Sequence, residues 1–342
     1  MHPSIELFRG IAAWLVLTTH YAHFLIPERS FLNFFWTGVD LFFVISGFVF
    51  ARTIYAGDLK IRPYFVRRVF RIYPLYFCSL LLYYGLTPDH PEKGMFFIKH
   101  LFFLHTTYSV EEAFFFNPAY WSLPVEMEFY LLVPLLTVFA IRYRYFLIIL
   151  LLSFLLFRLV IVSNLLDGLM PNLSAILNLH LPGILVEFLV GVFMFKVYTQ
   201  FNTLKIAYLM LIMMTGLLVL SALGIYFSWY GDDGISQVFW LKSYFNFYSA
   251  VGYSLLLFPF LILIQPKQSF FNSFCLFIGN ISYGVYLFHN LIPLLMKSLG
   301  YELTGVTAYL VYSGLVVMLA LVFYYAVETP ARSWGKKLST RD

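Results

Sequence analysis

Arg9 and His20 are two ionisable residues within one apolar segment near the start of the chain. A helix rises about 1.5 Å per residue, so a helical segment would separate them by roughly 16 Å, about half a bilayer core. Eleven residues are close to three turns, which directs both side chains to nearly the same side. Ionisable residues inside a membrane span are costly and mark functional sites. The pair predicts a polar track with His20 as general base. The structural alternative is that Arg9 snorkels to the interface and His20 only binds a neighbouring helix.

Asp40 is an acid inside the next apolar segment, which runs from Trp36 to Phe48. It could pair with Arg9 or orient His20, as an acid orients a catalytic imidazole. We therefore expect Arg9, His20 and Asp40 to form the catalytic group. Ser46-Gly47, in the same segment, is expected to serve close helix packing.

Arg67, Arg68 and Arg71 lie at spacings of three and four residues, so their guanidinium groups gather on one side of a helix. Guanidinium forks suit the recognition of phosphate groups. We interpret Arg67 as a topology signal and predict that Arg68 and Arg71, which lie nearer the membrane, bind an anionic ligand.

The stretch from Trp121 to Tyr130 opens an apolar segment with a serine and two acids. A proline at position 124 suits a first helical turn, and Ser122 is expected to cap the helix. Glu126 and Glu128 are two residues apart, so they point to different sides and make a poor acid–base pair. Alternatively, the two carboxylates only stabilise the start of the helix through a favourable interaction with the positive end of its dipole.

Ser282, Tyr286 and His289 share one face of a late apolar segment and predict a polar stripe inside a helix bundle. His289 is expected mid-span, either as a functional group or as a structural one that binds another helix. Glu187 and Glu328 are weaker candidates in neighbouring segments.

The composition defines the class of protein. The 342 residues are 61% hydrophobic and only 11% charged, whereas soluble domains carry about 25% charged residues. The chain is predicted to be an all-α polytopic membrane protein. Its net charge of +5 does not indicate nucleic-acid binding, because the basic residues gather in short loops between apolar runs. Cys78 and Cys275 are isolated, so neither a disulfide framework nor a metal site is predicted.

Hydropathy predicts about ten transmembrane helices. They lie at 7–26, 33–53, 69–86, 124–141, 146–165, 181–198, 205–227, 245–264, 274–296 and 305–327. The stretch 95–108 is apolar but short and is read as a re-entrant or interfacial helix in an outer loop, 87–123. We expect one membrane domain at 1–335 and a short cytoplasmic tail at 336–342.

The basic residues favour this count, with both termini in the cytoplasm. Most of the 22 lysines and arginines fall on the cytoplasmic side: Arg9, Arg52, Lys60, Arg62, Arg67, Arg68, Arg71, Arg142, Arg144, Lys196, Lys205, Lys267, Arg332, Lys336, Lys337 and Arg341. An eleventh span would move the basic loops of the second half outside.

Taken together, the clusters resemble the membrane-bound acyltransferase 3 family, whose members O-acylate bacterial surface carbohydrates and related acceptors. The resemblance covers nearly the whole chain and is carried by Arg9-Gly10 to His20, Gly38 to Phe48, Arg68 and Arg71 with Tyr73-Pro74, Trp121-Ser122-Leu123 with Glu126, Ser282-Tyr283 to His289, and Glu328-Thr329-Pro330. The family commonly has two adjacent glutamates followed by glutamine, where this chain has Glu126-Met127-Glu128. Glu126 therefore matches the first glutamate, and the second is left unassigned.

The resemblance implies an acyl-CoA donor, most often acetyl-CoA, a carbohydrate or glycolipid acceptor, and a bacterial cytoplasmic (inner) membrane location. It implies a catalytic set of His20, Arg9 and Asp40, a donor-binding set of Arg68, Arg71 and Tyr73, and a substrate-binding or structural set of Trp121, Ser122, Glu126, Tyr286 and His289. His20 would deprotonate an acceptor hydroxyl, which then attacks the thioester. Direct transfer is favoured over an acyl-enzyme, because the sequence places no cysteine or activated serine beside His20.

Two other classes of protein are compatible with the polar residues alone. A transporter or flippase for a lipid-linked sugar could use Asp40, Glu187 and His289 as a relay, although no internal repeat of the kind common in transporters is visible. A membrane interaction subunit without chemistry would leave the five polar clusters unexplained.

Overall fold

The computed structural model describes residues 2–264 and 269–340, and these residues form helices and turns without a β-strand. Lys267 and Arg341, assigned above to the cytoplasmic side, lie outside the described residues. The helices are α1 (Pro3–Leu25), η1 (Phe31–Thr37), α2 (Gly38–Ala56), α3 (Ile61–Leu86), α4 (Lys93–Leu101), α5 (Val110–Phe114), η2 (Pro118–Trp121), α6 (Ser122–Arg142), α7 (Phe146–Val162), η3 (Leu165–Gly168), α8 (Leu173–Asn178), α9 (Leu181–Gln200), α10 (Ile206–Gln237), α11 (Phe239–Leu263), α12 (Phe270–Phe288), α13 (Leu291–Ser298), α14 (Gly305–Phe323), η4 (Tyr324–Glu328) and α15 (Thr329–Ser339).

The prediction of an all-α polytopic membrane protein is confirmed. Eight helical stretches of the described chain are long and apolar enough to cross a membrane. They are Phe31–Ala56, Ile61–Leu86, Pro118–Arg142, Leu173–Gln200, Ile206–Gln237, Phe239–Leu263, Phe270–Phe288 and Gly305–Ser339. The two other predicted spans coincide with α1, whose ionisable side chains lower its hydropathy, and with α7, which has 17 residues.

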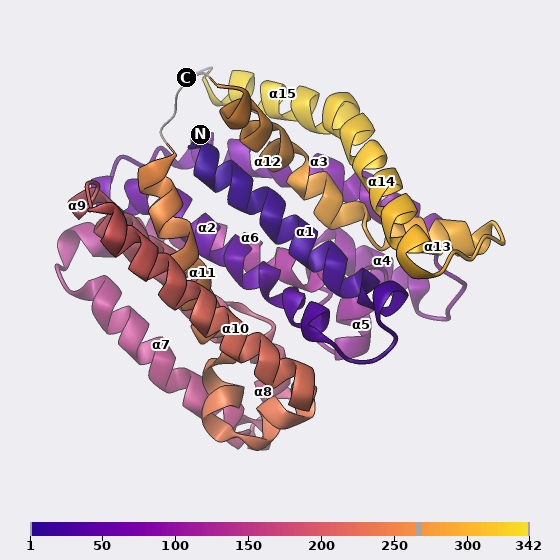
Figure 1. The fold of residues 1–342 in the computed structure, drawn as a ribbon, viewed down its shortest axis with the longest axis horizontal. Helices are drawn as coiled ribbons and strands as arrows, with labels where there is room; N and C mark the ends of the chain where they lie inside the picture. Colours follow the sequence, from indigo (N-terminus) through magenta and orange to yellow (C-terminus); the bar gives the residue numbers. More distant parts are fainter. Residues whose placement is uncertain (1, 265–268, 341–342) are drawn as a thin grey trace.

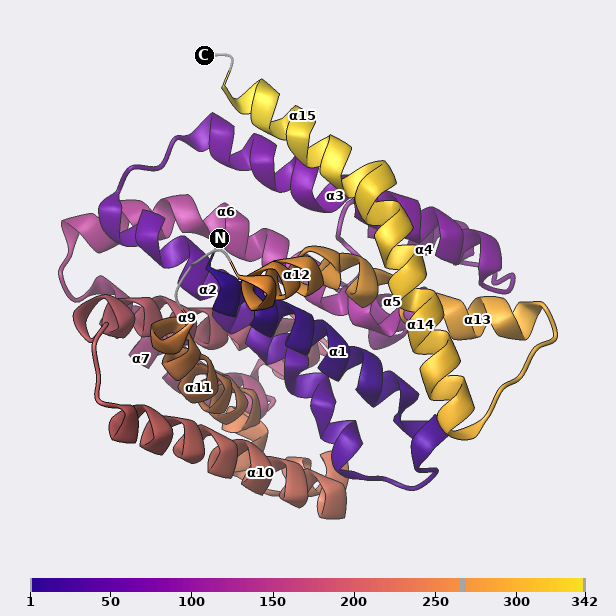
Figure 2. The same ribbon diagram turned by 45° about the horizontal axis from the view of Figure 1, so that its top comes forward.

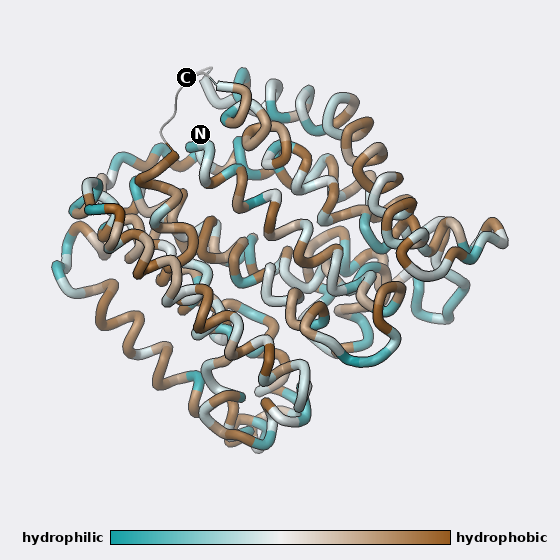
Figure 3. Tube along the Cα trace, viewed as in Figure 1, coloured by the Kyte–Doolittle hydropathy of each residue, from teal (hydrophilic) through white to brown (hydrophobic). Residues whose placement is uncertain are grey.

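The helices form one bundle in which α1 runs between α12 and α2 (Figure 1). Helix α2 packs along α9, and α10 packs along α11. The start of α1 lies at one end of the bundle, and α4, α5 and α13 lie at the other, in both views (Figures 1 and 2). Apolar residues dominate the long helices, while polar residues gather in the connections (Figure 3). This distribution is the one that a lipid-embedded bundle requires.

The predicted span 274–296 is wrong as a single helix, because α12 ends at Phe288 and α13 begins at Leu291. His289 is therefore the C-cap of α12 and is not mid-helix. A proline at position 293 has no N–H to offer the carbonyl four residues earlier, which is that of His289. The Tyr21 hydroxyl, from α1, donates to this carbonyl instead.

The segment 87–117, which we expected on the outer side, holds two short helices, α4 with nine residues and α5 with five. Neither is long enough to span a bilayer, so an eleventh span is excluded in this segment. The rings of His100 and His105 are buried and stack with centroids 3.9 Å apart. Burial lowers the pKa of His100 to about 2 and that of His105 to about 4. Both rings are therefore neutral at pH 7 and pack as aromatic groups.

The end of the chain turns back over α3. A π-helical turn, η4, joins α14 to α15, and Glu328 at this junction pairs with Arg332 at 3.3 Å. Residues 336–339, expected in a tail, belong to α15, which packs along α3. The Arg67 Nε donates to Ser339 Oγ at 2.9 Å.

Candidate active site

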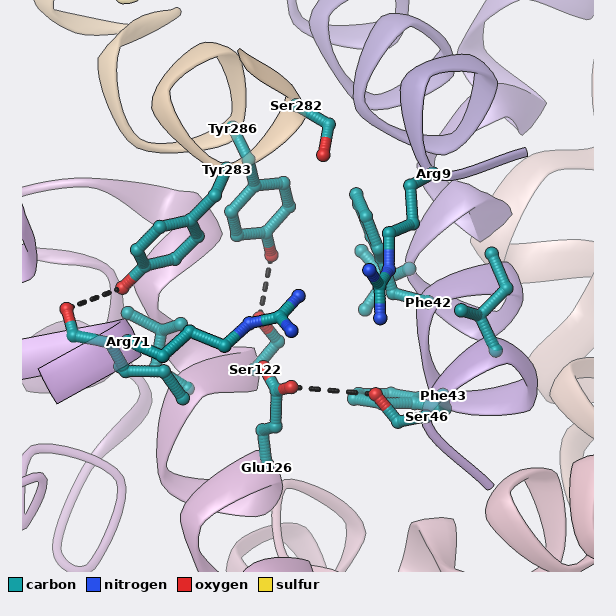
Figure 4. Close-up of a pocket in the computed structure, with 14 residues that line it drawn as sticks. Arg9, Phe42, Phe43, Ser46, Arg71, Ser122, Glu126, Ser282, Tyr283 and Tyr286 are labelled. Carbon is teal, nitrogen blue, oxygen red and sulfur yellow. Dashed lines mark hydrogen bonds between the residues drawn. The ribbon is translucent and has the colours of Figure 1, made fainter. Parts of the chain in front are cut away.

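The first candidate cavity lies between α1, α2, α3, α6 and α12 and has an empty volume of about 670 Å³. Its polar lining includes Arg9, Arg71, Glu126 and Ser46. Figure 4 shows the guanidinium groups of Arg9 and Arg71 pointing into the same space from opposite walls. We call this space the inner cavity, because both arginines come from the side of the bundle that the basic residues assign to the cytoplasm.

The two arginines of the inner cavity have different surroundings. Arg9 is buried and pairs with Glu6 at 2.8 Å within the first turns of α1. No hydrogen bond or ion pair joins the Arg71 guanidinium to another residue of the described chain. Two guanidinium groups that face one space repel each other, so an anion between them would be favoured.

The other residues of the arginine cluster do not line this cavity. Arg68 lies over the rings of Phe50 and Tyr130, at 4.9 and 5.7 Å. The ring of Tyr73 stacks on Phe77 with an interplanar angle of 8°. Of the predicted donor-binding residues Arg68, Arg71 and Tyr73, the structure places Arg71 alone on the inner cavity.

The serine motif connects α6 to α12. Ser122 is the first residue of α6 and does not cap it, which corrects the expectation; Asn117 caps the preceding turn η2 instead. The Ser122 hydroxyl lies 2.6 Å from the Tyr286 hydroxyl, and Tyr286 donates to the Ala119 carbonyl at 2.8 Å. This bond closes one wall of the inner cavity (Figure 4).

The two glutamates of α6 point to different sides, as their spacing predicts. Glu126 lines the inner cavity and accepts hydrogen bonds from Tyr130 and, at 3.4 Å, from Ser46. Glu128 accepts from the His180 ring and from the Leu181 backbone N–H at 2.8 Å. Glu128 therefore anchors the first turn of α9.

A second cavity, with an empty volume of about 1340 Å³, is lined by His20, Asp40, Trp36 and Trp121. It is also lined by Pro118, Asn178 and Asp232, which belong to η2, α8 and the last part of α10 and fall between the spans predicted from hydropathy. The charge pattern assigns these three stretches between predicted spans to the outer side. We call this space the outer cavity.

The hydrogen bond of His20 fixes the form of its ring. His20 Nδ1 lies 2.8 Å from the Val16 carbonyl oxygen, which can only accept, so Nδ1 carries the proton. In the neutral ring Nε2 then has a free lone pair. The His289 ring contacts His20 edge-on, with centroids 4.7 Å apart. His289 is held in turn by Tyr286 through Nδ1 and by Asn290 through Nε2.

Asp40 bonds neither to Arg9 nor to His20, which were its expected partners. Its Oδ1 accepts from Asn246 Nδ2 at 3.0 Å. Arg9 lies about three turns of α1 away from His20 and lines the inner cavity, out of reach of Asp40; Asp40 lines the outer cavity with His20, but its Oδ1 is occupied by Asn246. Ser46 lines the inner cavity, whereas Gly47 is confirmed in its packing role: a Cβ there would lie 1.9 Å from the Phe188 carbonyl oxygen.

Sequence reasoning missed several residues of the outer cavity. Arg158 and Lys242 both line it, and Arg158 pairs with the buried Glu187. Arg158 interrupts an otherwise apolar run in the sequence, which is the same signal that identified Asp40. Asn246, which lines the outer cavity, and Asn290, which holds His289, carry no charge and stand out only in three dimensions.

The two cavities meet at a shared wall. Val39 and Tyr286 line both of them. A group held by Arg9 and Arg71 and a group beside His20 are therefore separated by the Val39 and Tyr286 side chains. No group of three histidine, cysteine or acidic residues suited to a metal is found within the described parts of the chain. The geometry suits a reaction between two substrates that enter from opposite sides.

Comparison with known proteins identifies the family. The family model described as an acyltransferase domain, acyltransferase 3, matches residues 2–325. The chain is 26% identical to a "Putative acetyltransferase" of Acidianus two-tailed virus, over 96% of this chain and 90% of the relative. It is 24% identical to a "Putative O-acetyltransferase" of Staphylococcus aureus strain COL, over 98% of this chain and 58% of the relative.

A shorter similarity links the chain to a peptidoglycan O-acetyltransferase of Listeria monocytogenes, 26% identical over 39% of this chain and 23% of the relative. The chain thus spans little more than half the length of the staphylococcal relative and less of the listerial one. No solved structure matches the chain.

The family match decides between the three classes of protein that the polar clusters allowed. It covers nearly the whole described bundle, including both cavities, and it favours an enzyme over a transporter or a subunit without chemistry. The chain belongs to the acyltransferase 3 family and is a multi-pass membrane acyltransferase.

Proposed function

We propose that the protein moves an acyl group, in the first place acetyl, from cytoplasmic acyl-CoA to a hydroxyl of a cell-surface or periplasmic carbohydrate or glycolipid. The names of its relatives support acetyl transfer to oxygen. The membrane would be the cytoplasmic membrane of a bacterium. One observation carries the proposal: a cavity with two facing arginines and a cavity with His20 share the wall formed by Val39 and Tyr286.

Arg9 and Arg71 would hold phosphate groups of the donor in the inner cavity. Phosphate is the anion that guanidinium groups bind best, through paired hydrogen bonds. The pantetheine arm would extend past Tyr286 toward His20, a distance that the eleven-residue spacing on α1 sets at roughly 16 Å. Movement of the Tyr286 side chain would open the shared wall to the thioester.

His20 would act as the general base. Its Nε2 would accept the proton of the acceptor hydroxyl, because Nδ1 already donates to Val16. The hydroxyl oxygen would form a bond to the thioester carbonyl carbon, and the carbon–sulfur bond would break. The proton would pass from Nε2 to the departing sulfur, which leaves as the CoA thiol. His289 would hold the His20 ring in place through their edge contact.

The His20→Ala substitution tests this proposal in the purified full-length protein. Loss of a general base lowers rates by about 10²–10⁴, so we expect acetyl transfer from labelled acetyl-CoA to fall at least hundredfold. The affinity for CoA should change little, because Arg9 and Arg71 are intact.

The matched control is His23→Ala, one turn further along α1, where the ring is exposed and packs on Phe24. This variant should retain transfer. Equal rates in His20→Ala and the unsubstituted protein would refute the assignment of the base.

A further inference from the structure

The wall of the outer cavity contains buried polar atoms without a partner. Asp40 is 1% exposed, and its Oδ1 is bonded to Asn246. Its second oxygen, Oδ2, is buried and has no hydrogen-bond partner among the residues that the structure describes. A buried acceptor left unpaired lowers the stability of the protein, so a ligand that donates a hydrogen bond to Oδ2 would remove this penalty.

Arg158, on the same cavity, has a buried hydrogen-bond donor without a partner in the described part of the chain, whereas Asp40 has an acceptor without one. Arg158 is 5% exposed and directs one terminal nitrogen to Glu187. Its Nε is buried and likewise has no partner within the described ranges. Two residues that line the cavity therefore carry one unused acceptor and one unused donor. A hydroxyl group both donates and accepts, whereas an ammonium only donates and a carboxylate only accepts.

The charges around the outer cavity do not favour an anionic ligand. Asp40, Asp232, Arg158 and Lys242 line it, and the charge of Arg158 is compensated by Glu187. The Lys242 ammonium donates to the Val162 carbonyl at 3.2 Å. The positive charges therefore do not exceed the negative ones.

Aromatic residues provide the apolar part of the lining. Trp36, Phe114 and Trp121 line the outer cavity together with the polar groups. Apolar and aromatic surfaces with a few polar groups that set orientation are typical of ligand sites. A sugar ring matches this lining, because its carbon–hydrogen faces are apolar and its rim carries hydroxyl groups.

We propose that the outer cavity binds an uncharged, hydroxyl-rich sugar unit of the acceptor, and that Asp40 and Arg158 read its hydroxyl groups through Oδ2 and Nε. This inference rests on the proposed function and narrows the acceptor to a neutral sugar. Asp40 and Arg158 would determine the specificity for the acceptor sugar, and His20 would remain the general base.

The test uses the purified full-length protein with labelled acetyl-CoA and two oligosaccharides of equal length, one of neutral hexoses and one containing uronic acids. The neutral oligosaccharide should be acetylated with the higher kcat/KM. Asp40→Asn and Arg158→Lys should each raise its KM about tenfold or more, with less than a twofold change in the KM for acetyl-CoA. Arg158→Lys keeps the charge that pairs with Glu187, and the exposed Asp58→Asn is the matched control.

The outcomes separate this inference from the function on which it rests. A higher kcat/KM for the uronic acid acceptor, or an unchanged acceptor KM in both variants, would overturn the inference. Binding of acetyl-CoA without transfer to either sugar would also overturn the inference, but it would agree with the proposed binding of the donor in the inner cavity. Failure to bind acetyl-CoA at all would overturn the proposed function itself. The comparison of acceptors uses the unsubstituted protein and so does not depend on the folding of the variants.

Discussion

Three arginines on adjacent turns of α3 have three different environments. Arg67 bonds to Ser339, Arg68 stacks on aromatic rings, and Arg71 reaches into the inner cavity. A guanidinium can serve packing, a surface contact or anion binding, and its position on the helix decides which. Arg71 is therefore the member of the cluster best placed to bind the donor.

The Arg71→Ala variant should bind CoA about tenfold or more weakly, because a hydrogen bond to a charged group is lost. Isothermal titration of the purified protein with CoA measures this change. The control is Arg67→Ala, which lies off the cavity and should bind CoA normally. A comparable loss of affinity in both variants would mean that general positive charge, and not the Arg71 contact, attracts the donor.

At the scale of helices, the crossing of α2 and α9 sets the position of the residues that line both cavities. A Cβ at Gly47 would lie 1.9 Å from the Phe188 carbonyl oxygen, and one at Gly191 would lie 1.9 Å from the Val44 carbonyl oxygen. The two backbones therefore touch through reciprocal glycines, as in small-residue crossings of membrane helices. Asp40 and Ser46, on the same helix α2, owe their positions to this contact.

Gly47→Ala should force the helices apart and destabilise the protein by about 1–3 kcal/mol or more. The midpoint of thermal unfolding in detergent measures this effect. Gly314→Ala, in α14, is the control, because a Cβ there would meet nothing within 4 Å. It should melt at or slightly above the normal temperature, since alanine favours helix more than glycine does. Matching midpoints for the two variants would contradict the tight crossing.

At the scale of the whole molecule, the proposed reaction needs a cytoplasmic donor side and an outer acceptor side. The distribution of lysine and arginine predicts that both termini are cytoplasmic. The two cavities lie on opposite sides of the Val39 and Tyr286 wall, in the order that this topology requires. The orientation of the bundle therefore decides which substrate reaches which cavity.

Cysteine labelling of intact cells tests this orientation, after Cys78 and Cys275 are replaced by serine. Glu302→Cys, exposed after α13, should react with a membrane-impermeant maleimide. Thr340→Cys, exposed after α15, should react only once the cells are lysed. The reverse pattern would place the inner cavity outside and would exclude cytoplasmic acyl-CoA as its ligand.

Much of the architecture could be predicted because it depends on local properties of the chain. Apolar length and charge define membrane segments, so each predicted span falls on helical residues of the described structure, although 274–296 is divided between α12 and α13. The spacing of Glu126 and Glu128 placed them on different sides of α6 for the same reason. The boundary at His289 was missed although Pro293 is a local signal; what the sequence could not show is that Tyr21, from α1, donates to the His289 carbonyl.

The sequence by itself determined the class of protein, the helical segments and the polar clusters that fall within them. Only the tertiary structure decided which of those residues meet. Asp40 pairs with Asn246, 206 positions away, and not with Arg9 or His20. Arg9 and His20 share a helix yet line different cavities. Side-chain neighbours across helices depend on the rotation and depth at which the helices pack, and distant residues such as Gly47 and Gly191 set that packing.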